Sequence, residues 1–431
     1  MKVIPQLVLI VIPCLILTEA NNGHDDGLSV VRTSDTRVTD RRRLSEFERD
    51  LVIDAIETAG YPSDLHVVTT QDGYILKLHR IPDPSLDSTD NSGRGCSSNH
   101  QFTCFQGVVL LMHGLFSTAA DFVVTGPENG LAFILADAGY DVWMGNARGT
   151  RFSRQNLHVS AKSGQFWDFS WHEIGTSDLP ATIDYILRKT RQRKLYYIGH
   201  NQGVTAILAL LAEKPKYNQK ISGVAAMAPI AYLGNGESRG ILRSLAKFND
   251  QIWVTMNALN IFELTPSEGI MKFISNIICS EESLTREVCS DLLAEMFGYT
   301  SEQAKQLLPG VVENWMTGIS SKQLVHYGQL MQSKKFQQFD YKNFVTNMQR
   351  YKFGKPPEYN LSKISVPWIL FYGTKDFFTS SVDFKMITKA LPNVKHYFEL
   401  PNWTHIDFIY NAQIYAQVYS RIIQTMRNSA R

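Results

Sequence analysis

The chain has no strong excess of charge of either sign. Its 431 residues include 43 lysines and arginines and 41 aspartates and glutamates, so the formal net charge is only +2, and the charges are mixed along the sequence. Nucleic-acid-binding proteins concentrate their cations in a patch or stripe, which this sequence lacks. We therefore expect no nucleic acid among its partners.

The sequence also lacks the common signatures of metal and nucleotide sites. No His-x₃-His or Cys-x₂-Cys spacing occurs, although zinc sites commonly use such spacings. No GxGxxG and no P-loop sequence is present either. We therefore expect neither a metal nor another cofactor.

Cysteine is scarce, with five residues in the whole chain. Cys14 lies in the apolar N-terminal segment, and the other four form two local pairs, Cys96 with Cys104 and Cys279 with Cys289. Four cysteines allow three pairings, of which we favour the local one. Two short-range disulfides would suit an oxidising compartment, and free buried thiols are the alternative.

Only the N-terminus contains an apolar run long enough to be considered as a membrane span. Residues 1–20 combine Lys2, an apolar stretch and small residues near Ala20, which is typical of a secretory signal peptide. A membrane anchor is the alternative, but the stretch contains prolines and is shorter than the ~20 residues of a spanning helix. Residues 21–43 are polar, which is typical of a disordered leader. The segment ends in three arginines, which are either a processing site or a solvated run of charge. These features predict a secreted or lysosomal protein without a transmembrane segment.

Two Asn-x-Ser/Thr sequences predict N-glycosylation, which also suits a secreted protein. They begin at Asn360 and Asn402. Asn402 lies three residues before His405, so crowding could prevent its use.

Apolar runs alternate with helical patterns over residues 44–233 and again over residues 337–431. Strand candidates are residues 107–112, 141–144, 195–198, 221–228, 368–372 and 394–400, and helix candidates are residues 131–138, 178–188, 204–213 and 407–426. Such alternation predicts an α/β fold with a mostly parallel sheet that helices cover on both faces. Residues 234–336 show helical periodicity and little strand character, so we expect an inserted helical cap.

The most informative segment is Gly199-His200-Asn201-Gln202-Gly203, between a predicted strand and a predicted helix. It has the glycine frame of G-x-S-x-G, the nucleophile elbow of the α/β-hydrolase fold. The glycines allow a sharp turn that a Cβ would block. Asn201 stands where this motif has serine, and an amide nitrogen cannot be activated by histidine to attack an ester.

The remaining parts of a hydrolase site follow in the expected order. Asp376 and His405 each lie just after a predicted strand, in the chain order nucleophile, acid, histidine. His405 would take a proton from a nucleophile, and Asp376 would orient its imidazole. The backbone N–H groups of Leu115 and Gln202 would form an oxyanion hole.

With these residues assembled, the chain resembles the animal acid lipase family, which includes gastric, lysosomal and insect digestive lipases. The resemblance covers roughly residues 48–425 and rests on several segments, namely residues 60–62, 66–76, 113–115, 126–146, 166–171, 178–181, 326–329 and 359–361. It implies that Asp376 and His405 are the triad acid and base, that Leu115 and Gln202 are the oxyanion donors, and that Cys279 and Cys289 form a cap disulfide. It also implies neutral lipid, a triacylglycerol or steryl ester, as the partner.

The sequence leaves several functions open. One hypothesis is a secreted pseudo-lipase that binds lipid or a lipid–water interface without ester turnover, because Asn201 replaces the nucleophile. Another is a working lipase, in which Asn201 is a variant or a sequence error. Two further alternatives are deamidation of Asn201 to a carboxylate nucleophile and a purely structural role without ligand. The oligomeric state is not predicted.

Overall fold

The computed structural model describes residues 50–83, 105–235, 246–264 and 317–429. Its strands are β1 (Asp64–Thr69), β2 (Tyr74–Ile81), β3 (Gly107–Met112), β4 (Tyr140–Gly145), β5 (Gln155–Asn156), β6 (Leu195–His200), β7 (Ile221–Met227), β8 (Glu263–Leu264), β9 (Ile319–Ser320), β10 (Trp368–Gly373) and β11 (Val394–Leu400). Its α-helices are α2 (Leu51–Thr58), α4 (Leu131–Asp137), α5 (Trp171–Glu173), α6 (Leu179–Thr190), α7 (Gln202–Glu213), α9 (Asn249–Ala258), α13 (Ser321–Ser333), α14 (Phe344–Tyr351), α15 (Ser381–Ala390), α16 (Asp407–Tyr410) and α17 (Ser420–Ser429).

The main sheet follows the order β1-β2-β4-β3-β6-β7-β10-β11, with β5 paired to β2. All pairs from β4 to β11 along this order are parallel, whereas β1, β2 and β5 pair antiparallel. The predicted α/β-hydrolase fold, with a mostly parallel sheet and helices on both faces, is confirmed.

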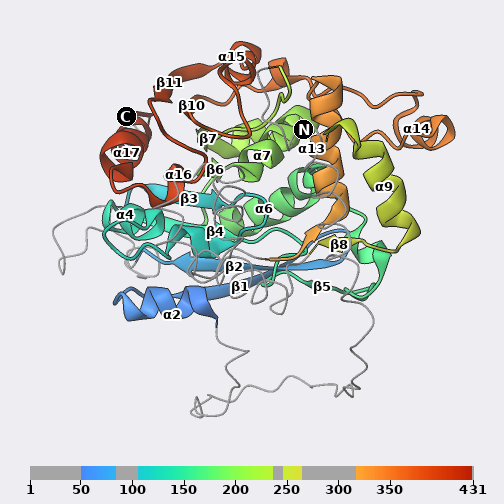
Figure 1. Cartoon of the computed structure of the whole chain (residues 1–431). Coiled ribbons are helices and arrows are strands. Elements are labelled where there is room, and N and C mark those ends of the chain that lie inside the picture. The colour runs from blue at the N-terminus through green and yellow to red at the C-terminus, as the bar shows by residue number, and fades with distance from the viewer. Residues whose placement is uncertain (1–49, 84–104, 236–245, 265–316, 430–431) are drawn as a thin grey trace, which may run out of the picture.

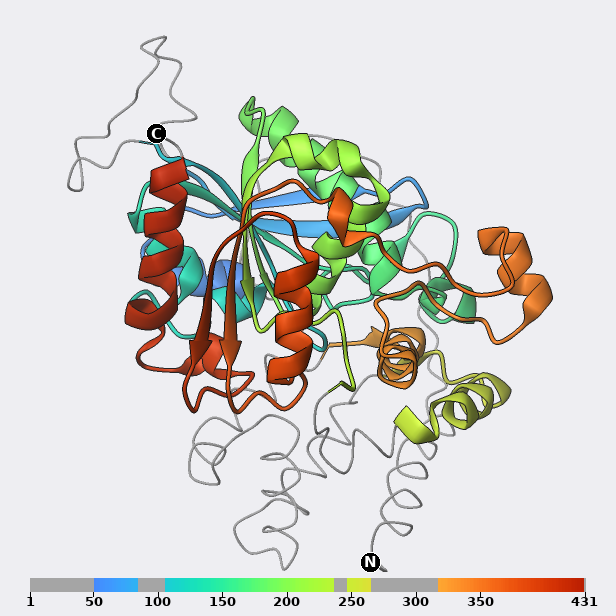
Figure 2. The same cartoon turned by 90° about the horizontal axis from the view of Figure 1, so that it is seen from above.

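Side chains of the central strands alternate between two apolar clusters, one on each face of the sheet. In β3, Leu110 belongs to the cluster with α6 and α7, and Leu111 belongs to the cluster with α4 and α17. Figures 1 and 2 show these two helix pairs on opposite sides of the sheet. Burial on both faces explains why the strands are continuous apolar runs.

The chain reverses direction across the sheet at β3, which lies between β4 and β6. Ligands of open α/β sheets bind at the carboxyl ends of strands beside such a switch point. The elbow at the end of β6 therefore lies where a substrate site is expected.

One sequence expectation about local structure is wrong. The predicted final helix over residues 407–426 is interrupted after α16, because Asn411 is extended (ψ 129°) and its side chain accepts a hydrogen bond from the Gln413 N–H at 2.8 Å. Such side-chain bonds compete with helix continuation. Within the range predicted to be a helical cap, β8 and β9 form a small antiparallel pair beside helices α9 and α13.

Candidate active site

The elbow between β6 and α7 adopts a strained turn. Asn201 has φ 50° and ψ −114°, a backbone conformation that residues other than glycine rarely adopt. A Cβ at Gly203 would collide with the carbonyl of Met112, and one at Gly199 would lie 2.9 Å from the Gly203 carbonyl carbon. Both glycines are therefore required by close backbone approach, as the sequence predicts.

The three residues expected to form a triad lie together. His405 Nδ1 lies 2.9 Å from Asp376 Oδ2, and His405 Nε2 lies 2.5 Å from Asn201 Nδ2. Because a carboxylate only accepts hydrogen bonds, Nδ1 donates and Nε2 accepts from the amide. Asp376 is oriented in turn by the N–H groups of Phe378 and Thr379, which donate to its other oxygen at 2.8 and 3.1 Å.

The two N–H groups predicted to be oxyanion donors also lie beside Asn201, and both donate to its side chain. The N–H groups of Leu115 and Gln202 donate to Asn201 Oδ1, at 3.2 and 2.5 Å. Backbone N–H groups can only donate, so the amide oxygen must face them. The carboxamide of Asn201 therefore spans the candidate site, with its oxygen on the two predicted oxyanion donors and its nitrogen on His405.

His113 holds the turn that presents Leu115. Its Nδ1 donates to the Gly114 carbonyl at 2.7 Å, and its Nε2 accepts from the Ala147 N–H at 3.1 Å. Burial lowers the pKa of His113 to about 4, so the ring is neutral and keeps one donor and one acceptor.

Helix α13, which ends the predicted cap range, contacts the elbow helix directly. Gln323 Nε2 donates to Gln202 Oε1 at 3.0 Å, and Tyr327 donates to Thr205 at 3.1 Å. These contacts hold α13 against Gln202, whose N–H is one of the two predicted oxyanion donors.

Sequence reasoning missed an ion cluster around buried Arg148, beside the candidate site. Arg148 pairs with Asp72 and Asp178, through contacts of 2.6 Å to each, and its guanidinium lies 3.9 Å from the Tyr74 ring centroid. Arg148 follows Ala147, which His113 binds, so the cluster fixes the chain beside the oxyanion turn. Asp72 and Asp178 both lie in segments that carry the family resemblance, but their sequences gave no sign of a shared partner.

Another buried carboxyl group, that of Asp121, lies a few residues after the turn that presents Leu115. It is only 3% exposed, and within the described residues no hydrogen-bond donor meets either carboxylate oxygen. Burial raises its pKa to about 7. The raised pKa means that the fold favours protonated Asp121. The stabilisation that the protonated carboxyl provides is therefore complete below its unfolded pKa of about 4. It is lost progressively as the pH rises from there through about 7.

We expect Asp121→Asn to raise the free energy of unfolding at pH 8 by a few kcal/mol, about 4 at most, and at pH 5 by only about 1.5 kcal/mol, since the unfolded carboxyl is already ionised there. Urea unfolding of both proteins at the two pH values measures this difference. Burial lowers the pKa values of His113 and His326 to about 4 and 3, so these residues make the fold more stable at neutral pH than at acidic pH. Their effect is the same in both proteins and cancels in the comparison. An equal effect of the substitution at pH 5 and pH 8 would contradict the assignment.

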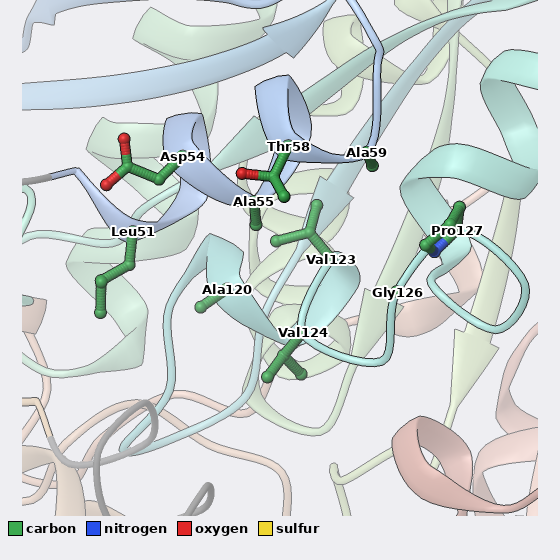
Figure 3. Close-up of a pocket in the computed structure, with 10 residues that line it drawn as sticks. All are labelled: Leu51, Asp54, Ala55, Thr58, Ala59, Ala120, Val123, Val124, Gly126 and Pro127. Atoms are coloured by element: carbon green, nitrogen blue, oxygen red, sulfur yellow. The ribbon is translucent and has the colours of Figure 1, made fainter.

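A groove of about 530 Å³ lies elsewhere, between α2 and the chain that follows residue 119 (Figure 3). Its lining is Leu51, Asp54, Ala55, Thr58, Ala59, Ala120, Val123, Val124, Gly126 and Pro127. None of Asn201, Asp376 and His405 lines it, so it is separate from the candidate site.

Other predicted sites are only partly described. Cys96, Cys104, Cys279 and Cys289 and residues 1–43 lie outside the described residues, so the disulfides, the signal peptide and the leader stay predictions. Asn360 and Asn402 are both exposed. Among the described residues, no group of acidic, histidine or cysteine side chains could hold a metal, and no helix there is long and apolar enough to span a bilayer.

Comparison with known proteins places the chain among lipases. The model of a partial alpha/beta-hydrolase lipase region matches residues 52–126, and that of the alpha/beta hydrolase fold matches residues 107–265. Lipase 3 of Drosophila melanogaster is 36% identical over 86% of this chain and 92% of its own length. Human gastric triacylglycerol lipase is 35% identical over 84% of this chain and 87% of its own. Among solved structures, the alpha/beta hydrolase GrgF from Penicillium shares the fold at 12% identity, with a TM-score of 0.51 over 86% of this chain and 99% of its own.

Proposed function

The chain belongs to the animal acid lipase family of α/β-hydrolases, and from this premise we propose that it is a pseudo-lipase, which binds neutral lipid without hydrolysing it. One observation carries the proposal: the carboxamide of Asn201 satisfies the groups that would act on a substrate ester. Its oxygen accepts from the Leu115 and Gln202 N–H groups, and its nitrogen donates to His405.

This arrangement opposes ester hydrolysis in two separate ways. An amide nitrogen offers no lone pair for attack, so the nucleophilic step is absent. The amide oxygen also fills the position where the oxyanion of a tetrahedral intermediate would be stabilised. In lipases with serine at the elbow, that position receives the substrate oxygen, so a simple loss of the hydroxyl would leave the hole open. Here the side chain closes it.

Neutral lipid is the ligand class that the family relationship supports. One relative is named a triacylglycerol lipase, and we propose that this chain keeps affinity for the acyl chains of such lipids. Because its oxyanion hole is occupied, recognition relies on apolar contacts with the acyl chains rather than on the ester carbonyl. We further propose secretion or lysosomal delivery through the signal peptide, and a cap over residues 234–336.

We expect the native chain to bind a fluorescent fatty acid saturably and to show no turnover of triglyceride emulsion or a short-chain ester. Asn201→Ala opens the hole and lets water react there, so this variant should exceed the native rate by at least about tenfold. Parallel binding and esterase assays of both proteins test this. The proposal fails if the native chain retains no lipid, or if it hydrolyses ester at a rate that a serine-directed phosphonate blocks.

The alternative is an active lipase whose natural residue at position 201 is serine. The intact Asp376–His405 pair favours it, because both groups are in position to serve a nucleophile. Sequencing the natural transcript distinguishes the two functions. Intact-mass measurement of the peptide that contains Asn201 tests deamidation, which would add about 1 Da and supply a carboxylate nucleophile.

A further inference from the structure

Helix α14 (Phe344–Tyr351) has its apolar side outward and a polar residue inward. Phe344, Val345 and Met348 are 70%, 60% and 39% exposed, whereas Asn347 is 2% exposed. Phe353, just after the helix, is 66% exposed. A helix on the surface of a globular protein normally buries its apolar face and exposes its polar face. Burial of apolar side chains in the core therefore does not explain the orientation of α14.

The structure holds α14 in this orientation through polar contacts. Asn347 Nδ2 donates to Asp340 Oδ1 at 2.9 Å and to the Gly354 carbonyl at 3.2 Å, and its Oδ1 accepts from the Tyr341 N–H at 3.2 Å. These bonds fix the inner side of the helix. On the outer side, a Cβ at Gly354 would collide with the Phe344 ring, so this ring lies directly over the backbone beside Phe353. The exposed rings thus belong to one local surface.

This surface is also cationic. The segment from Lys342 to Lys355 contains four cations, Lys342, Arg350, Lys352 and Lys355, and no carboxylate. Lys342 pairs with Asp250 of α9 at 3.2 Å. Within the described part of the chain, no carboxylate forms a salt bridge with Arg350, Lys352 or Lys355, and all three side chains are exposed. Exposed aromatic groups therefore lie among unpaired positive charges.

We propose that α14 with Phe353 is a docking surface for an anionic lipid–water interface. Helices that lie in such an interface insert aromatic and aliphatic side chains and place lysine and arginine at the level of the headgroups. Figures 1 and 2 both show α14 at the periphery, away from the sheet, where a flat surface can approach it. A two-turn helix is small for a stable protein partner, which would need about 20–30 residues on each side.

This surface is independent of the Asn201 site. Lipid binding near the elbow concerns single molecules, whereas α14 would hold the whole protein at an assembled surface. Retention of a monomeric fatty acid and sedimentation with vesicles therefore report the two proposals separately.

The test is co-sedimentation of the full chain with vesicles of phosphatidylcholine, with and without phosphatidylserine. We expect binding to the mixed vesicles, and a loss of tenfold or more in Phe344→Ser/Phe353→Ser. Each cation near an anionic surface strengthens binding about fivefold. Lys352→Gln/Lys355→Gln should therefore weaken binding to the mixed vesicles by about 25-fold and leave binding to phosphatidylcholine alone unchanged.

Matched controls are Tyr415→Ser, an exposed apolar position near the C-terminus, and Lys385→Gln/Lys389→Gln on α15, which remove the same charge. These controls should bind mixed vesicles like the native chain. Equal binding by the α14 variants and the native chain, with unchanged circular dichroism, would overturn the proposal. So would a concentration-dependent dimer that Phe344→Ser/Phe353→Ser dissociates, because the surface would then bind a second copy of the chain.

Discussion

Replacing Asn201 with serine is expected to raise ester hydrolysis by about 10³-fold or more. A triad acts as a unit, so restoring its missing member recovers most of the joint effect of the three residues. The other members are already in place, since His405 Nδ1 lies 2.9 Å from Asp376 Oδ2. The change should appear in kcat/KM for a short-chain ester, and a serine-directed phosphonate should abolish it.

The site geometry gives a specific reason for this gain. A serine side chain lacks the carboxamide whose oxygen now accepts from the N–H groups of Leu115 and Gln202. Both donors then become available to the substrate oxygen, and His405 Nε2 becomes available to the hydroxyl. Serine is smaller than asparagine, so the elbow between Gly199 and Gly203 has room for it. One substitution thus supplies the nucleophile and empties the oxyanion hole.

The double variant Asn201→Ser/His405→Ala is the control, and its rate should fall back to that of Asn201→Ala or below, because the serine then has no base. Asn201→Ala separates the two contributions, because it empties the hole without supplying a nucleophile and should therefore lie between the native chain and Asn201→Ser. If Asn201→Ser folds normally and stays inert, the pocket has diverged as well, and the chain is a binding protein that one substitution cannot restore.

The sequence predicted the parts of this site that depend on local pattern. Strand β3 and the strand and helix around Gly199–Gly203 follow from apolar runs and glycine spacing, because buried parallel strands and a tight turn leave clear signals. The order of Asp376 and His405 then predicted their meeting at the carboxyl edge of the sheet.

Other features could not be predicted, since they depend on tertiary contacts. The position of the Asn201 amide follows from its rotamer and from the donors that surround it, which the identity of the residue does not specify. The break after α16 depends on one side-chain hydrogen bond of Asn411 within an otherwise helical pattern.

The antiparallel strands β1 and β2 were not predicted individually, because β2 includes buried His79 and Arg80, which obscure an apolar pattern. Arg80 is satisfied there by Asp141, at 2.9 Å.

The second large effect concerns stability, for which Arg148→Ala is expected to cost about 3–5 kcal/mol. Asp178 is 1% exposed, and it accepts from the Arg148 side chain at 2.8 Å and from its backbone N–H at 3.1 Å. Burial raises the pKa of Asp178, and the attraction of Arg148 opposes that rise. Removing the guanidinium leaves a buried carboxylate without a counter-ion, which is the costly way to break a buried ion pair. Urea unfolding measures the loss.

The control is Arg154→Ala, which removes an ion pair between Arg154 and Glu263 whose side chains are 39% and 21% exposed. We expect it to cost less than about 1 kcal/mol, since water replaces the lost contact. A loss in Arg154→Ala as large as that in Arg148→Ala would mean that burial does not determine the cost.

Adding Asp178→Asn to Arg148→Ala should restore part of the lost stability, because the neutral amide no longer requires a counter-ion. The two substitutions would then be non-additive, with a coupling energy of about 1–3 kcal/mol. Asp72 should behave differently, because its side chain is 44% exposed and water can solvate the carboxylate once Arg148 is gone. Arg148→Ala/Asp72→Asn is therefore expected to remain about as unstable as Arg148→Ala alone. If Asp72→Asn rescued stability and Asp178→Asn did not, the destabilising carboxylate in Arg148→Ala would be Asp72. That result would contradict the role assigned to Arg148 as the counter-ion of buried Asp178.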